Sequence, residues 1–282
     1  MTHRSPTALV FCANLVVLVA AAPSALAADA SPWDGTERAA VRLIAAKPQA
    51  GVTIHRAAVE IRLAAGWKTY WRYPGDSGVP PRFDFSASQN VKSVTVRWPA
   101  PERLTDEGGT SIGYKHDVVF PLDVVAEDKT KPVVLALGID YAVCEKLCVP
   151  ADGKSELTLT GVSGEQDGKI ARSEALVPRP AAIGAGGTLA IRAVKREDGG
   201  TKPRVLVDVA SPANVPVALF AEGPTPDWAL PVPEAVGGAP AGQQRFAFDI
   251  DGLPPNTPPG GATLSLTAVA GDQAIEVPFR LD

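Results

Sequence analysis

The sequence has little sulfur, no basic block and no long apolar segment beyond its first residues, and each shortage excludes a class of function. Of 282 residues three are cysteine, and the single methionine is Met1. The 27 Lys and Arg residues are scattered and outnumbered by 31 Asp and Glu residues, which gives a net charge of −4. We therefore expect neither nucleic acid nor an anionic membrane surface as a partner.

The one export signal lies at the start of the chain. Arg4 precedes an apolar stretch from Leu9 to Ala22, and the small-x-small sequence Ala25-Leu26-Ala27 follows it. This pattern predicts a signal peptide over residues 1–27, cleaved after Ala27, and a periplasmic mature protein. No later apolar run reaches the roughly 20 residues of a membrane-spanning helix, so we expect no membrane span in the mature chain.

Motifs for hydrolytic, phosphate or metal chemistry are absent from the sequence. It contains no G-x-S-x-G, no G-x-x-x-x-G-K-[ST] and no H-E-x-x-H. Two thiols and two histidines, His55 and His116, leave a metal site as an alternative, but structural zinc needs four ligands with local pairing. Methionine, which would assist a copper site, occurs only at position 1. We expect no metal and no cofactor, and we interpret both histidines as ordinary strand or loop residues.

Alternating apolar residues between turn residues predict strands along most of the chain, because a period of two gives a strand one buried face. The 27 prolines and 26 glycines disfavour long helices and suit many turns. The sequence therefore predicts an all-β fold of antiparallel β-sandwiches. The alternating sets are Val59, Ile61 and Leu63; Val94, Val96 and Trp98; Phe120 and Leu122; Val133, Leu135 and Leu137; Leu157 and Leu159; Val205, Val207 and Val209; Phe246, Phe248 and Ile250; Leu264 and Leu266; and Ile275, Val277, Phe279 and Leu281.

The alternation lapses between Gly161 and Gly187, which predicts a domain boundary. We expect a first sandwich over residues 28–162, a short helix with a linker over residues 163–186, and a second, smaller sandwich over residues 187–282. No cysteine or histidine lies beyond Cys148, so the second domain is expected to be dispensable for thiol chemistry.

Cys144 and Cys148 are the cysteines left after export, and they enter a compartment that oxidises thiols. They lie between two predicted strands, where a loop exposes reactive groups. A structural disulfide and a redox-active pair are both open interpretations. A disulfide closing so short a loop stabilises by roughly 2 kcal/mol, which favours exchange over bracing, but the C-x3-C spacing is less specific than C-x-x-C.

Aromatic residues gather near the predicted pair and in one earlier segment. Tyr141 flanks the pair and is a candidate to shield its sulfur atoms from water. Trp67, Tyr70, Trp71 and Tyr73 form a cluster that suits either sugar stacking or packing, and in a β-sandwich we interpret it as packing.

Several segments together resemble the amino-terminal periplasmic domain of the thiol:disulfide interchange protein DsbD and its relative in the suppressor-of-copper-sensitivity protein ScsB. They occur in the family's order within residues 50–160. The segments are Gly66-Trp67-Lys68-Thr69-Tyr70-Trp71-Arg72-Tyr73-Pro74-Gly75-Asp76-Ser77-Gly78, Trp98-Pro99-Ala100-Pro101, Gly113-Tyr114, Val118-Val119-Phe120-Pro121-Leu122, and Asp140-Tyr141-Ala142-Val143-Cys144-Glu145-Lys146-Leu147-Cys148-Val149-Pro150.

The resemblance implies an immunoglobulin-like sandwich that takes electrons from a membrane-embedded thiol reductase. The acceptors it implies are periplasmic thioredoxin-like or isomerase proteins, cytochrome-maturation proteins among them. Cys148 would form the mixed disulfide and Cys144 would resolve it. The family's aromatic cap corresponds to residues 105–110, where this sequence has glycines, so Tyr114 or Tyr141 would have to shield the pair.

The sequence thus leads to a periplasmic thiol-disulfide electron-transfer module, a component of protein-disulfide reduction. The alternative is a non-catalytic periplasmic binding or assembly protein with a structural disulfide, linked to copper tolerance.

Overall fold

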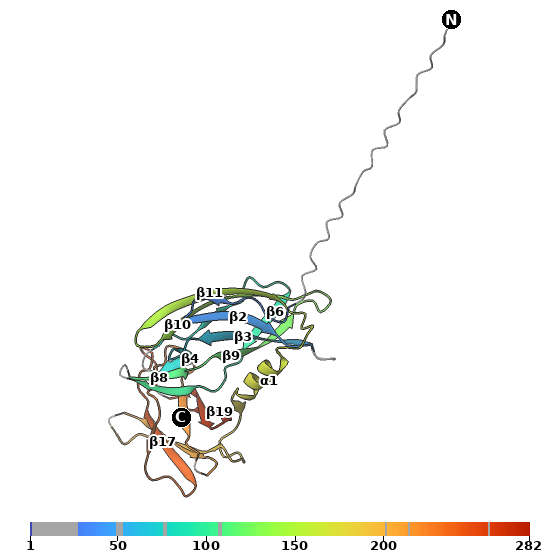
Figure 1. Cartoon of the computed structure of the whole chain (residues 1–282). Helices are drawn as coiled ribbons and strands as arrows, with labels where there is room; N and C mark the ends of the chain where they lie inside the picture. The colour runs from blue at the N-terminus through green and yellow to red at the C-terminus, as the bar shows by residue number, and fades with distance from the viewer. Residues whose placement is uncertain are drawn as a thin grey trace.

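β-Strands dominate the structure, a computed structural model in which α1 (Asp167–Ala175) is the one α-helix of the described residues (Figure 1). The structure describes Met1 and residues 28–48, 53–75, 78–106, 109–200, 202–213, 215–258 and 260–282. The predicted signal peptide, residues 1–27, otherwise lies outside this part of the chain. No helix in the described ranges is long and apolar enough to cross a bilayer.

The amino-terminal region contains two antiparallel sheets. In the first, the strand order is β1 (Asp34–Gly35), β2 (Ala39–Ala45), β3 (Ile54–Leu63), β9 (Val118–Ala126) and β6 (Val91–Val96). In the second, the order is β11 (Cys148–Thr158), β10 (Val134–Cys144), β4 (Lys68–Gly75), β8 (Gly109–Tyr114) and β7 (Glu102–Asp106), and β5 (Arg82–Asp84) also pairs with β10.

The core of this region lies between the two sheets and includes residues from each of the alternating sets predicted for it, some of them only partly buried. Edge-to-face aromatic contacts join Phe120 to Trp98, with ring centroids 5.0 Å apart, and to Tyr114, with centroids 5.5 Å apart. The alternation therefore identified the buried faces correctly. Core residues from the predicted sets include Val59, Ile61, Phe120, Leu122, Leu135, Leu137 and Leu157.

Helix α1 covers the outer face of the first sheet, where Ile170 packs with Ile44 and Ala58. Glu60 of β3 is buried and pairs with Arg42 at 2.7 Å and with Lys169 of the helix. The short helix predicted within residues 163–186 is present as α1. Because the helix covers this face, β3 is buried on both sides and its alternation of burial is incomplete.

The carboxy-terminal region contains two four-stranded sheets with their own core. One has the order β12 (Arg179–Pro180), β19 (Gln273–Arg280), β18 (Thr263–Ala270) and β15 (Ala218–Glu222), and its β12–β19 pair is parallel. The other has the order β13 (Ala190–Glu197), β14 (Arg204–Ala210), β17 (Gln243–Asp249) and β16 (Glu234–Val236).

The prediction of a mostly β chain with antiparallel sheets is confirmed. In Figure 1 the two regions lie against each other, with α1 beside their junction. Phe220 and Val232 of the carboxy-terminal region belong to the core cluster of the amino-terminal region. The domain limits at residues 162 and 187 stay a prediction, and the sharing of core residues between the two regions is a feature that the sequence analysis did not address.

Asp29, near the start of the segment 28–48, is hydrogen-bonded to the loop before α1. Its carboxylate accepts hydrogen bonds from the backbone N–H groups of Ser163 and Gly164, at 3.1 and 2.6 Å, and from the Ser163 hydroxyl. Burial raises the pKa of Asp29, but these hydrogen bonds outweigh burial and leave the pKa below its ordinary value of 3.8.

We predict that Asp29→Ala lowers the free energy of unfolding by about 1 to 3 kcal/mol at neutral pH, since it leaves several donors unpaired. The lowered folded-state pKa means that the charge-dependent part of this stabilisation is present above pH 3.8 and is lost as the pH falls through the lowered pKa. Urea unfolding at several pH values measures the difference. Asp84→Ala is the control, because the Asp84 carboxylate accepts from Ser86 two residues away. An equal loss in both variants would contradict the prediction.

Candidate redox site

The cysteine pair closes a long β-hairpin. Strands β10 and β11 pair in unbroken antiparallel register from Val134 opposite Thr158 to Cys144 opposite Cys148. Residues 145–147 form the turn between them, and Leu147 in this turn is 79% exposed. The ladder therefore brings the two cysteines together at the end of the hairpin before any covalent bond is considered.

Cys144 and Cys148 form a disulfide, and the two residues differ in exposure. Cys144 is 2% exposed and packs in a small cluster with Tyr70 and Ala142, whereas Cys148 is exposed. A partner protein can thus approach Cys148 directly, while Cys144 is covered.

Tyr70 of β4 touches both sulfur atoms. Its hydroxyl lies 2.7 Å from Cys144 Sγ and 3.2 Å from Cys148 Sγ, and its side chain is almost completely buried. A disulfide sulfur carries no proton, so the Tyr70 O–H is the donor in this state. The same donor is positioned to stabilise negative charge on Cys144 Sγ when the disulfide opens.

Two glycines allow the chain to enclose Tyr70. At Gly78 a Cβ atom would lie 2.4 Å from the Tyr70 ring, and the backbone there has φ +147°, a conformation that favours glycine. At Gly113 of β8 a Cβ atom would lie 2.0 Å from the Thr69 carbonyl oxygen. Thr69 also donates to the Ala142 carbonyl at 3.0 Å. The backbone at Gly78 and at Gly113 therefore packs closely around Tyr70 and its neighbour Thr69, and the Thr69–Ala142 hydrogen bond joins β4 to β10 beside the tyrosine.

A lysine shares the face of the sheet on which Cys144 lies. Lys68 is directly opposite Cys144 in the register between β4 and β10, and directly paired residues project to the same side. Its ammonium group also donates to the Ser111 hydroxyl at 3.3 Å. Lys68 and Tyr70, two residues apart on one strand, thus place a cation and a hydroxyl on the side of the buried sulfur.

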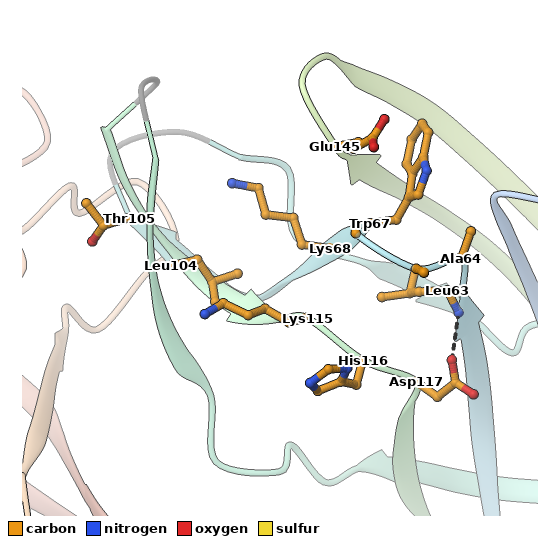
Figure 2. Close-up of a pocket in the computed structure, with 12 residues that line it drawn as sticks. Leu63, Ala64, Trp67, Lys68, Leu104, Thr105, Lys115, His116, Asp117 and Glu145 are labelled. Carbon is orange, nitrogen blue, oxygen red and sulfur yellow. Dashed lines mark hydrogen bonds between the residues drawn. The ribbon is translucent and has the colours of Figure 1, made fainter.

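A cavity of about 780 Å³ opens beside the hairpin. Figure 2 shows Trp67 and Glu145 together at one end, Lys115 and His116 at the other, and Lys68 between them. Glu145 directly follows Cys144 in the chain, and Lys68 is opposite Cys144 in the register between β4 and β10. The cavity therefore begins next to the cysteine pair. Its lining carries both signs of charge.

The tyrosines that the sequence suggested as shields lie in the main core. Tyr141 and Tyr114 belong to the cluster between the sheets, and Tyr114 donates to the Pro99 carbonyl at 2.9 Å. Burial raises the pKa of Tyr141 to about 12, with Asp152 and Asp34 adding to the shift, and burial also raises the pKa of Tyr114 well above its ordinary value of 10.0, so both stay neutral phenols. Shielding by either residue stays a prediction, and the tyrosine whose hydroxyl lies against the sulfurs is Tyr70.

Other residues singled out in the sequence are separate from the pair. His55 is in β3, opposite Val124, and His116 is exposed between β8 and β9. In the described ranges, no group of three or more His, Cys, Asp or Glu side chains is placed to hold a metal ion. Of the segment that corresponds to the family's cap, residues 107 and 108 lie outside the described residues.

The fold and this site define a class of protein: a mostly β chain with an exposed and a buried sulfur joined at the end of one hairpin. Residues 40–160 match the family described as thiol:disulfide interchange protein DsbD, N-terminal. This part of the chain is similar to that family, and it contains both cysteines.

A solved structure extends the similarity to most of the chain. It is described as the crystal structure of the N-terminal periplasmic domain of ScsB from Proteus mirabilis, with a TM-score of 0.70 and 21% identity. The similarity covers 90% of this chain and 98% of that one. At this identity the likeness establishes a shared fold. No sequence among the curated proteins matches the chain.

We predict that Tyr70→Phe slows reduction of the disulfide by dithiothreitol by at least about tenfold, since the leaving thiolate loses a hydrogen-bond donor while the ring packing is kept. Stopped-flow or quenched alkylation of the thiols measures the rate. Tyr141→Phe removes a hydroxyl that is buried without a hydrogen-bond partner in the described part of the chain, and it should react at the wild-type rate. Equal rates for wild type and Tyr70→Phe would contradict the assignment of Tyr70.

Proposed function

We propose that the protein is a thiol-disulfide exchange module that passes electrons to partner proteins through Cys148. The observation that carries this proposal is the unequal exposure of the two cysteine residues: Cys148 is exposed, and Cys144 is buried with its sulfur against the Tyr70 hydroxyl. The similarity of residues 40–160 to the DsbD amino-terminal family supports it independently.

The chemistry starts from the reduced pair. The Cys148 thiolate attacks one sulfur of a partner disulfide, so that a Cys148–partner bond forms and the partner's other sulfur leaves as a thiolate. The Cys144 thiolate then attacks Cys148 Sγ, which forms the Cys144–Cys148 disulfide and releases the second partner thiolate. The partner gains two electrons and takes two protons from solvent. A dithiol donor must then return two electrons to the pair by the reverse sequence.

The asymmetry of the pair assigns the roles. Cys148 is accessible for the attack, and Cys144 is adjacent to it across the hairpin, where it can resolve the mixed disulfide. Tyr70 and Lys68 are placed to favour the thiolate form of the buried sulfur. Cys148 is therefore in position for the attack on the partner disulfide and Cys144 for resolution of the mixed disulfide, and neither step needs a cofactor.

A purely structural disulfide is the competing function, and the hairpin argues against it. The β10–β11 ladder already fixes the two cysteines opposite each other. Closing the short loop covalently would add roughly 2 kcal/mol on the chain-entropy account. A protein with two cores of its own gains little from that bond, whereas an exposed sulfur at a hairpin end suits exchange.

The wider setting follows from the family and the solved structure. We propose a periplasmic location with export through residues 1–27, because the similar ScsB domain is described as periplasmic. We also propose an immunoglobulin-like sandwich over residues 28–162, a membrane-embedded thiol reductase as donor, and thioredoxin-like or isomerase proteins as acceptors.

We predict that Cys144→Ser accumulates mixed disulfides through Cys148 when it is incubated with an oxidised thioredoxin-like protein, because the resolving thiol is missing. Cys148→Ser is the matched variant and should accumulate few, since its remaining sulfur is buried. Non-reducing electrophoresis followed by mass spectrometry detects the adducts.

Both variants should keep the β-sheet circular dichroism and lose at most roughly 2 kcal/mol relative to the oxidised protein. Trapping by Cys148→Ser in place of Cys144→Ser would reverse the roles. If neither variant forms adducts and both lose their fold, the disulfide is structural.

A further inference from the structure

Strand β4 connects the cysteine pair to the carboxy-terminal sheets through consecutive residues. Tyr70 contacts the two sulfurs. The next residue, Trp71, packs its ring against Phe220 with centroids 5.8 Å apart. Arg72 then pairs with two carboxylates of the carboxy-terminal region. One short segment thus touches both the redox site and the other region of the chain.

Arg72 connects β4 to the carboxy-terminal region through hydrogen bonds of fixed orientation. Its Nε and Nη2 atoms donate to the two carboxylate oxygens of Glu222 at 2.8 and 2.7 Å, and Nη2 also donates to Glu276. The guanidinium lies 4.4 Å from the centroid of the Trp71 ring. A two-point Arg–carboxylate pair fixes orientation as well as distance, which a lysine cannot reproduce.

Strand pairing does not fix every residue of β4, so the side-chain contacts of Arg72 matter for its position. Thr69 and Tyr70 pair with β8, the register is then interrupted, and it resumes at Gly75. On the other side, β10 pairs with β4 at Lys68 and Thr69. The segment that begins at Arg72 is therefore positioned by its side-chain contacts, and Tyr73 adds another by donating to the Leu230 carbonyl.

We propose that Arg72 is a positioning residue for thiol exchange, through which Glu222 and Glu276 hold β4 so that the Tyr70 hydroxyl stays against the sulfurs. Tyr70 and Arg72 are two residues apart on one strand, so a displacement of the arginine is transmitted to the tyrosine along the backbone. The carboxy-terminal region thereby acquires a role in the chemistry without contributing a sulfur. This replaces the expectation that it is dispensable, and it rests on the proposed function.

The test compares the rates at which dithiothreitol reduces the full-length oxidised protein. Arg72→Lys keeps the charge but loses the two-point contact, and we expect the rate to fall roughly three- to tenfold. In a Tyr70→Phe background the same substitution should have no further effect, because the two residues act through one hydroxyl. Glu222→Gln should behave like Arg72→Lys and serves as the second variant if Arg72→Lys does not fold.

Arg103→Lys is the matched control. Arg103 of β7 also joins the two regions, donating to Glu234 at 3.2 Å and to the Pro233 carbonyl at 2.6 Å, but the hydrogen bonds to the sulfurs among the described residues come from Tyr70 of β4. It should be reduced at the wild-type rate. Near-ultraviolet circular dichroism checks that each variant is folded.

Three results would overturn the inference: a wild-type rate for both Arg72→Lys and Glu222→Gln, an equal slowing in the Tyr70→Phe background, or an equal slowing by Arg103→Lys. In each of these the wild-type disulfide is still reduced readily, so the proposed function survives. A wild-type disulfide that resists dithiothreitol would overturn the proposed function and this inference together.

Discussion

The register between β10 and β11 is the constraint on which the site depends. It runs without a bulge to Cys144 opposite Cys148, so the pair meets because the strands are in register. A shift by one residue would turn Cys144 to the other face of the sheet and away from Tyr70. The aliphatic residues of β10, among them Leu135, Leu137 and Ile139, fix this register because they must face the core. Hydrophobic packing therefore sets the geometry of the sulfur chemistry.

In the second sheet of the amino-terminal region, one face packs in the core and the other carries the buried cysteine. One face builds the core, where Tyr141 is buried, while Cys144 and Ala142 lie on the face that meets Tyr70. Strand β4 crosses from this site to the carboxy-terminal region, and Arg72 lies at that junction. A half-buried two-point ion pair such as Arg72–Glu222 is weak evidence for stability, since desolvation offsets much of its Coulomb energy. Its contribution is better understood as fixing one orientation, which is what a hydrogen-bond donor beside a reacting sulfur needs.

The sequence predicted the local features of this structure well and its long-range ones poorly. Alternation found strands such as β9, from Phe120 and Leu122, and β14, from Val205 to Val209, because a buried face repeats every second residue. Cys144 and Cys148 were identified as a pair because they are the cysteines that remain after the predicted signal peptide. Tyr70 was taken for packing because its partner lies 74 residues away, and the contact of Arg72 with Glu276 spans 204 residues. Their one local signal was that Lys68, Tyr70 and Arg72 alternate along a strand, which places three polar groups on one face.

The central claim is that the Cys144–Cys148 bond is made and broken in use, and its reduction potential tests that claim most directly. Equilibration of the full-length protein with glutathione buffers of known ratio, followed by alkylation of the free thiols, gives the potential. The account predicts a value above about −300 mV, within the range where thiol-disulfide proteins exchange electrons. A value well below about −300 mV would show a resistant structural disulfide and contradict the account.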